Sequence, residues 1–332
     1  MKPTSILSVK IISTGIFMPG EPVTSTQLEV KYNKSQGWTD KHSGVQQRHW
    51  AGPGDTCTSM GVAALQNALT AAGMMYDDLD LVVSASATYD YPIPHNACLI
   101  QSHFESSKPV PGFDIDATCL GWIVAMEVCS KMLDGVRYKR IAIVCSEIAS
   151  THLNPEDWET FSLLGDGAFA CILGSADEVG QGLIHADMKT YPQAAKTNIV
   201  EIGGNAFPFH AYPIDERRFF KMDGKHLLKL AYETVPSFFN GFFKDLDIRL
   251  SDVKWIFPHQ ASLPGLVLSE RLLGMNEDQL VINIQNYGNT LSCAAGIALH
   301  ETLIAEKVQR GDLIMIVGTG AGFSIGGSLW RF

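Results

Sequence analysis

Basic residues are scarce in this chain. Its 332 residues include 25 Lys and Arg against 35 Asp and Glu, a formal net charge of −10 at pH 7. A sequence-independent grip on nucleic-acid phosphates needs an excess of Lys and Arg, so we expect no nucleic-acid partner. Long apolar runs are also lacking. The longest, such as Ile141–Cys145 and Leu313–Val317, have the length of a strand and fall far short of a membrane span.

The first residues lack both an apolar core of about 7–15 residues and a cleavage site, so no secretory signal is expected. The seven cysteines include no pair with Cys-x-x-Cys spacing, and no cluster has the spacing of metal ligands. These absences predict a reduced cytoplasmic protein without a metal, in which each cysteine is either core filler or a reactive thiol.

What the chain does contain is a repeated order of helices and strands. The length allows one large α/β domain or two medium ones. A unit of helix, acidic turn and apolar strand occurs twice, at 59–73 with 81–83 and at 225–243 with 255–257. A unit of strand, helix and strand follows each, at 113–117, 119–133 and 141–145, and at 281–284, 291–307 and 313–317. The alternation predicts mixed, largely parallel sheets covered by helices. The repetition predicts two halves, 1–176 and 177–332, joined near a glycine cluster at 174–183.

Three polar residues fall at the ends of strands in this scheme. Cys119 follows a strand and begins a helix, where the free N–H groups and the helix dipole favour a thiolate. His259 follows Pro258 at the end of a second-half strand, and Asn289 lies in a turn before a helix. Since loops at the carboxyl ends of strands form ligand sites, we expect these three side chains to converge where the halves meet. The other six cysteines are interpreted as small core residues, namely Cys57, Cys98, Cys129, Cys145, Cys171 and Cys293.

The motifs around these residues resemble one family. In order, they are Ala-Thr-Cys-Leu-Gly at 117–121, Gly-Asp-Gly at 165–167, Pro-His-Gln-Ala at 258–261, Gly-Asn-Thr at 288–290 and a glycine-rich ending at 318–332. This set is similar to that of the β-ketoacyl-acyl carrier protein synthase III family, condensing enzymes of the thiolase superfamily. The resemblance covers nearly the whole chain. It implies an α/β fold, a five-layer αβαβα sandwich of two similar halves, in a homodimer without a cofactor.

The resemblance also implies residue roles. Cys119 matches the nucleophile that takes an acyl group from a thioester, while His259 and Asn289 match the pair that binds a malonyl thioester and supports its decarboxylation. Two neutral donors at that position can stabilise the enolate formed. The backbone N–H groups of Cys119 and Ala321 match the oxyanion hole of the acyl transfer.

The expected substrate residues include departures from the family. Trp38 matches a tryptophan that stacks on the adenine of coenzyme A, but Trp158 and His42 stand where arginines are usual. The resemblance thus leaves open whether the acyl donor is carried by coenzyme A or by acyl carrier protein. Tyr91 matches the aromatic residue of the acyl pocket, in a loop, 88–96, that is about two residues longer than usual. Thr319 replaces an aromatic near the decarboxylation site, and Phe220 is expected along the pantetheine tunnel.

Lys229 and Arg271 match basic positions that dock the carrier protein, whereas Pro264 stands where another basic residue is common. Together these features predict an acyltransferase of EC class 2.3.1 that joins an acyl thioester to a malonyl thioester, in a specialised fatty-acid or polyketide-type pathway. Two alternatives stay open: transfer of the acyl group to a non-malonyl acceptor without decarboxylation, and a non-catalytic partner in a heterodimeric synthase. The chain length and type of the primer are not predicted.

Overall fold

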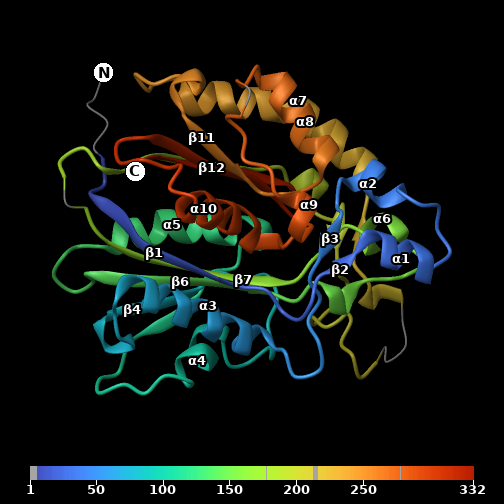
Figure 1. Ribbon diagram of the computed structural model, residues 1–332, viewed down its shortest axis with the longest axis horizontal. Coiled ribbons are helices and arrows are strands. Elements are labelled where there is room, and N and C mark those ends of the chain that lie inside the picture. The colour runs from blue at the N-terminus through green and yellow to red at the C-terminus, as the bar shows by residue number, and fades with distance from the viewer. Residues whose placement is uncertain (1–5, 177, 212–215, 277) are drawn as a thin grey trace.

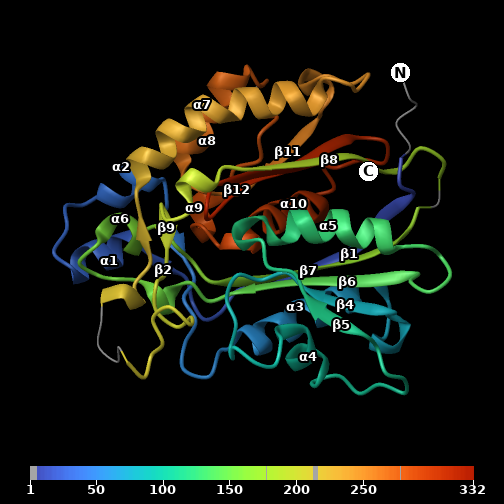
Figure 2. The same ribbon diagram turned by 180° about the vertical axis from the view of Figure 1, so that it is seen from behind.

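Helices and sheets alternate in five layers in the computed structural model, which describes residues 6–332 apart from 177, 212–215 and 277 (Figure 1). A four-stranded and a five-stranded sheet enclose a middle layer of two helices, and each sheet carries further helices on its outer face. The view from behind shows the same stacking (Figure 2). The outer helices are α7 (Gly224–Phe243) and α8 (Leu263–Leu273) on one side and α3 (Cys57–Ala72) and α4 (Asn96–Gln101) on the other, and the middle ones are α5 (Gly121–Met132) and α10 (Ala294–Ile304). The predicted αβαβα sandwich is confirmed.

The two sheets have related strand orders. The first runs β1–β7–β6–β4–β5, with β1 Val9–Phe17, β4 Leu81–Ser84, β5 Gly112–Asp114, β6 Arg140–Glu147 and β7 Gly167–Ser175. The second runs β11–β12–β13–β8, with β8 Gly182–Thr190, β11 Trp255–Pro258, β12 Leu313–Gly320 and β13 Ser324–Arg331. In both sheets a parallel pair, β4 with β6 or β11 with β12, continues into two antiparallel strands. The parallel pairs β4–β6 and β11–β12 each join four residues of one strand to four of the other.

The remaining elements are short. They comprise strands β2 (Val23–Thr24), β3 (Gln47–Arg48), β9 (Asn198–Ile199) and β10 (Lys221–Met222) and helices α1 (Ser25–Lys31), α2 (Trp38–Ser43), α6 (Trp158–Phe161) and α9 (Ile284–Tyr287). Single 3₁₀ turns occur at η1 (Tyr76–Asp78), η2 (Thr118–Leu120), η3 (Ser150–His152), η4 (Pro192–Ala194), η5 (Glu216–Arg218), η6 (Leu250–Asp252) and η7 (Leu291–Cys293). No helix among the described residues is both long and apolar enough to cross a membrane.

Two expectations about the strands are wrong. The sheets are not largely parallel, because β12 turns directly into β13 at Gly320–Ser324 and so tight a connection requires antiparallel strands. The predicted strand at 281–284 is absent: only Leu280 forms an isolated bridge, to Ile256, and the chain then enters α9. A short apolar run suits a buried turn as well as a strand, and periodicity alone does not separate the two.

Local signals account for the helix ends. Thr56 caps α3 and forms a capping box with Ser59, and Gly73 ends the helix in the left-handed conformation at φ +63°. In α7 the Asp223 carboxylate accepts from the His226 N–H, and one face of the helix is buried through Leu230, Val235, Phe238, Phe239 and Phe242. These apolar side chains cover the outer face of the second sheet.

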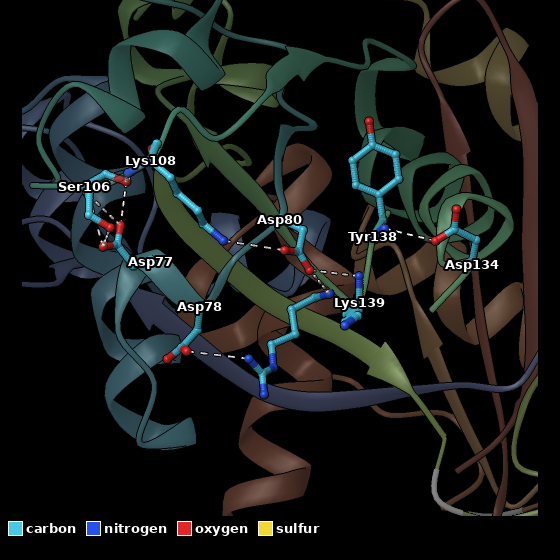
Figure 3. A network of polar contacts seen from close by, with 10 residues as sticks. Asp77, Asp78, Asp80, Ser106, Lys108, Asp134, Tyr138 and Lys139 are labelled. Carbon is cyan, nitrogen blue, oxygen red and sulfur yellow. Dashed lines mark hydrogen bonds and ion pairs between the residues drawn. The ribbon is translucent and has the colours of Figure 1, made fainter. Parts of the chain in front are cut away.

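A polar network joins the beginnings of β4 and β6 in the first sheet (Figure 3). The Asp80 carboxylate accepts from the backbone N–H of Lys139 at 2.9 Å and of Arg140 at 3.0 Å, and it pairs with Lys108 at 3.6 Å. Asp134 accepts from three successive N–H groups of the turn before β6, including that of Tyr138. The network therefore sets where β6 begins.

Candidate active site

Cys119 lies in the 3₁₀ turn η2, directly before α5, and is half-buried. Thr118 has φ +51°, a left-handed conformation that L side chains rarely adopt. The Asp116 carboxylate accepts from the Thr118 N–H at 2.8 Å and thereby stabilises the turn. Because the strained backbone of Thr118 is held in place, the Cys119 side chain does not follow the direction of the α5 side chains, and its sulfur lies at the start of that helix.

The end of β12 approaches this turn closely. A Cβ on Gly320 would come within 2.8 Å of the Thr118 hydroxyl oxygen, so only glycine allows the contact. The Cys119 sulfur lies against the backbone N–H groups of Ala321 and of Cys119 itself, and both lower its pKa. Two amide donors that face this sulfur also face an oxygen on a carbon bonded to it, which is the arrangement of an oxyanion hole. The Ala321 backbone N–H therefore lies beside the Cys119 sulfur, and its role in an oxyanion hole stays a prediction.

His259 follows β11 and is 5% exposed. Its backbone N–H donates to the Val317 carbonyl at 2.8 Å, and a Cβ on Gly318 would lie 2.6 Å from the His259 Cβ and 3.3 Å from the Leu120 side chain. Gly318 therefore brings His259 against the residue that follows Cys119. Burial lowers the pKa of His259 from 6.5 to about 4, so the imidazole is neutral at physiological pH. Its Nδ1 is buried without a hydrogen-bond partner among the described residues.

Asn289 lies in the turn after α9 and is 8% exposed. Its backbone N–H donates to the Leu163 carbonyl, and its own carbonyl accepts from the Gly165 N–H, each at 3.0 Å. The side-chain Oδ1 accepts from the Leu291 N–H at 3.0 Å, which leaves Nδ2 as the donor of this amide. The Leu291 backbone also interacts with the His259 imidazole, so one residue joins both predicted donors.

The ionisation of Cys119 differs from the sequence expectation of a thiolate. Burial, and then the charge of Glu147, raise the pKa of Cys119 to about 12 and outweigh the two amides. Desolvation penalises the charged form more than one short helix terminus favours it. Cys119 is therefore a thiol and His259 a neutral imidazole in the resting site.

Glu147 was not expected at the site. It ends β6, is completely buried and accepts hydrogen bonds from the loop after β4 and from Ser292. Burial raises its pKa to about 7. The sequence did hold a signal, because Glu147 lies two residues after the apolar run Ile141–Cys145, and a glutamate in such a strand is costly to bury unless it has several donors.

The other residues that are expected to bind the substrate belong to other segments of the sequence than Cys119. Trp38 stacks on His42 at a centroid distance of 3.9 Å, and Trp158 packs against it edge-on at 6.4 Å. Thr319 is half-buried in the β12–β13 pair, opposite Ile325. Phe220 is half-buried against the apolar cluster under α7, and Tyr91 is 58% exposed. Their roles stay predictions.

Of the six cysteines interpreted as core residues, five are buried, and Cys98 is wrong because it is exposed on α4. That helix has only six residues, too few for the apolar pattern to fix which face it buries. Lys229 on α7 and Arg271 on α8 are both exposed, on helices that lie side by side (Figures 1 and 2). Within the described ranges no group of three His, Cys, Asp or Glu could hold a metal.

Comparisons with known proteins agree with this architecture. Residues 113–192 match the family model for 3-oxoacyl-acyl carrier protein synthase III, and residues 243–332 match the model for its C-terminal part. The chain is 30% identical over 323 residues to a β-ketoacyl-acyl carrier protein synthase III of Histophilus somni, covering 97% of this chain and 99% of that protein.

Among solved structures, the 3-oxoacyl-acyl carrier protein synthase III of Aquifex aeolicus superposes with a TM-score of 0.87 at 28% identity, over 98% of this chain and 100% of that one. The priming β-ketosynthase of the R1128 polyketide pathway shares the fold, with a TM-score of 0.86 at 23% identity over 99% and 98% of the two chains. With its Cys, His and Asn set on matching turns of this fold, the chain belongs to the β-ketoacyl-acyl carrier protein synthase III family of condensing acyltransferases.

Proposed function

We propose that this protein catalyses a decarboxylative Claisen condensation between an acyl thioester and a malonyl thioester through an acyl-Cys119 intermediate. The observation that carries the proposal is that the turn of Cys119, whose sulfur lies against two backbone amides, packs beside the turns of His259 and Asn289, whose side chains are neutral donors. Neutral hydrogen-bond donors can stabilise an enolate oxygen directly, because no proton has to be transferred before the enolate forms.

The chemistry balances in two half-reactions. In the first, the Cys119 sulfur bonds to the acyl carbon, the bond from that carbon to the donor sulfur breaks, and the donor thiol leaves with the cysteine proton. In the second, the bond to the malonyl carboxylate breaks, carbon dioxide leaves, and the electron pair forms an enolate held by His259 and Asn289. The enolate carbon attacks the acyl carbon, the bond to Cys119 breaks, and protonation restores the thiol.

Intact mass spectrometry with a series of acyl thioesters tests the first half-reaction, and carbon dioxide release from malonyl carrier protein tests the second. The proposal expects an acyl adduct on Cys119 and malonyl-dependent release of carbon dioxide. An adduct without that release would favour transfer to another acceptor. The absence of any adduct on the pure protein would point to a non-catalytic partner, and either outcome overturns the condensation.

For the acyl donor, the surroundings of Trp38 support carrier protein more than coenzyme A. One face of its indole is covered by His42, and Trp158 is buried in the neighbouring apolar cluster. No cationic side chain occupies position 158 to hold an adenine from the other side. Together with the departures at Thr319 and Pro264, this supports a specialised fatty-acid or polyketide-type pathway.

We also propose a homodimer of chains whose halves, 1–176 and 177–332, share one site. The loop after β4 supports this, because it exposes Tyr89, Tyr91 and Ile93 at 57%, 58% and 86%. Three large apolar side chains on one loop are costly to leave in water, and a second copy would cover them. Light scattering should give twice the chain mass. All seven cysteines are free, which supports a cytoplasmic location.

Tyr91 is predicted to select the primer. Replacing Tyr91 with alanine should enlarge the acyl pocket and change the ratio of kcat/KM between a short and a long acyl donor about tenfold. Competition between two donors, read out as product masses, measures this ratio. Tyr89→Ala on the same loop is the matched control. Equal kcat/KM ratios in both variants would show that Tyr91 does not line the acyl pocket.

Lys229 and Arg271 are predicted to dock the carrier protein. Because the chain carries −10 overall, an acidic carrier needs a local basic surface. The double variant Lys229→Glu with Arg271→Glu should raise KM for acyl carrier protein about tenfold, and more at low salt, with kcat little changed. Lys139→Glu, in the network of Figure 3, serves as the exposed control. A similar rise in both proteins would show a general charge effect instead of docking.

A further inference from the structure

Glu147 is a buried carboxylate to which the condensation assigns no step. Its Oε1 accepts from the Ala87 N–H at 2.8 Å and from the Ser292 hydroxyl, and its Oε2 accepts from the Thr88 N–H at 3.0 Å and the Thr88 hydroxyl at 2.8 Å. No ion pair with Glu147 occurs in the described part of the chain. Four donors on one buried carboxylate compensate its desolvation only while all of them stay in place.

These donors come from two segments that matter to the proposed reaction. Thr88 begins the loop that carries Tyr91, and its carbonyl accepts from the Asn96 side chain at the loop's other end. Ser292 lies in η7, three residues after Asn289. Glu147 is thus a bridge between the loop of the expected acyl pocket and the turn of the expected malonyl site.

The matching of the two sheets adds a second observation. Cys119 follows Thr118, at φ +51°, in η2, and Ser292 follows Leu291, also at φ +51°, in η7. Ser292 therefore occupies in the second half the position that Cys119 occupies in the first. The two turns are close, since a Cβ on Gly121 would lie 3.4 Å from the Ser292 Cβ.

We propose that Glu147 is a positioning residue of the condensation site, which ties the Tyr91 loop to the Asn289 turn and places one negative charge near the turn of Cys119. The proposal rests on the proposed function for the step that it affects. Its effect on the Cys119 sulfur itself does not depend on which reaction the enzyme performs.

Electrostatics supports the second part. The Glu147 charge is the largest contribution after burial to the raised pKa of Cys119. Within the described residues, the groups whose pKa the Glu147 charge raises are thiols: Cys57 of α3, Cys119 of η2, Cys293 of η7 and, on the same strand as Glu147, Cys145. Asp116 is the other acid that raises the pKa of Cys119. Since burial raises the pKa of Glu147 to about 7, this carboxyl group ionises within the physiological pH range.

Alkylation of Cys119 by iodoacetamide, followed by peptide mass spectrometry between pH 5.5 and 9.5, tests the charge. The thiolate reacts, so log rate against pH has unit slope except where Glu147 ionises and opposes thiolate formation. The wild type should show a flattening near pH 7, and Glu147→Gln a straight line with a rate about tenfold higher at pH 8. A loosened structure alone would raise the rate without removing the flattening. A flattening that persists in Glu147→Gln would overturn the proposal.

Ser292→Ala tests the bridge and also covers the case in which Glu147→Gln fails to fold. It should lower malonyl-dependent condensation about tenfold while the rate of Cys119 acylation stays close to wild type. It should also move the flattening to higher pH, since the carboxylate loses a donor. Wild-type rates in both half-reactions with an unmoved flattening would overturn the proposal.

Two further variants complete the design. Glu147→Asp keeps the charge but shortens the reach, so it should retain the flattening and still condense slowly. Asp114→Asn, an exposed carboxylate that accepts from the Asn96 and Ala97 N–H groups, is the control for loss of a loop contact. If the wild type alkylates as expected but never condenses, the proposed function fails while the charge effect stands.

Discussion

Replacing Cys119 with alanine is expected to abolish the acyl-enzyme and to lower condensation at least about 10⁴-fold. The reason is chemical, since the proposed acyl-enzyme forms on the sulfur of Cys119, which lies against the Ala321 amide. Folding should be little affected, because the side chain is small and half-buried. Intact mass after incubation with an acyl thioester should show no adduct, and the melting temperature should stay close to that of the wild type.

Cys98→Ala is the matched control for this result. Cys98 is the exposed cysteine and the one most open to non-enzymatic acylation, and it lies on α4, on the outer face of the first sheet. Its removal should leave both the adduct and the turnover intact. An adduct that survives Cys119→Ala but disappears in Cys98→Ala would show that the labelled thiol is adventitious.

The sequence was informative about elements with long or strongly marked patterns. The helix expected at 59–73 is α3, at Cys57–Ala72, and the one expected at 225–243 is α7, at Gly224–Phe243. Capping residues and a closing glycine carry that information locally. The strand expected at 281–284 failed because a segment of four residues, three of them apolar, is too short to define a period. Strand direction failed because it depends on connections that the pattern does not encode.

The sequence likewise predicted only part of the candidate site: the positions of its residues but not their ionisation. Cys119, His259 and Asn289 were placed at turns because each follows or precedes a recognisable element, and the structure brings these turns together. Their ionisation was not predictable, since it depends on burial from all sides. The same enclosure lowers the pKa of His259 and raises that of Cys119. Glu147 was missed because its partners, Thr88 and Ser292, are 59 and 145 residues away in the chain.

His259→Ala is expected to separate the two half-reactions. Acylation of Cys119 should persist at close to the wild-type rate, while decarboxylation of the malonyl thioester falls about 10²–10³-fold through loss of one enolate donor. Rapid-quench mass spectrometry measures the first step, and carbon dioxide release measures the second. His185→Ala, a half-buried imidazole that packs on Phe242 instead, should change neither rate. Equal losses in both half-reactions would make His259 a base for Cys119 and not an enolate donor.

The ionisation of His259 adds a pH test of the same role. Its pKa falls from 6.5 to about 4 on folding, so between these values the unfolded chain binds a proton that the folded chain does not. Stability therefore rises with pH across this window, and His259→Ala should reduce that rise. Because the folded imidazole stays neutral above about pH 4, the decarboxylation rate should show no titration of His259 between pH 5.5 and 8. A loss of decarboxylation centred near pH 6.5 that disappears in His259→Ala would mean that the imidazole is charged more readily than its burial allows, and the neutral-donor mechanism would have to be abandoned.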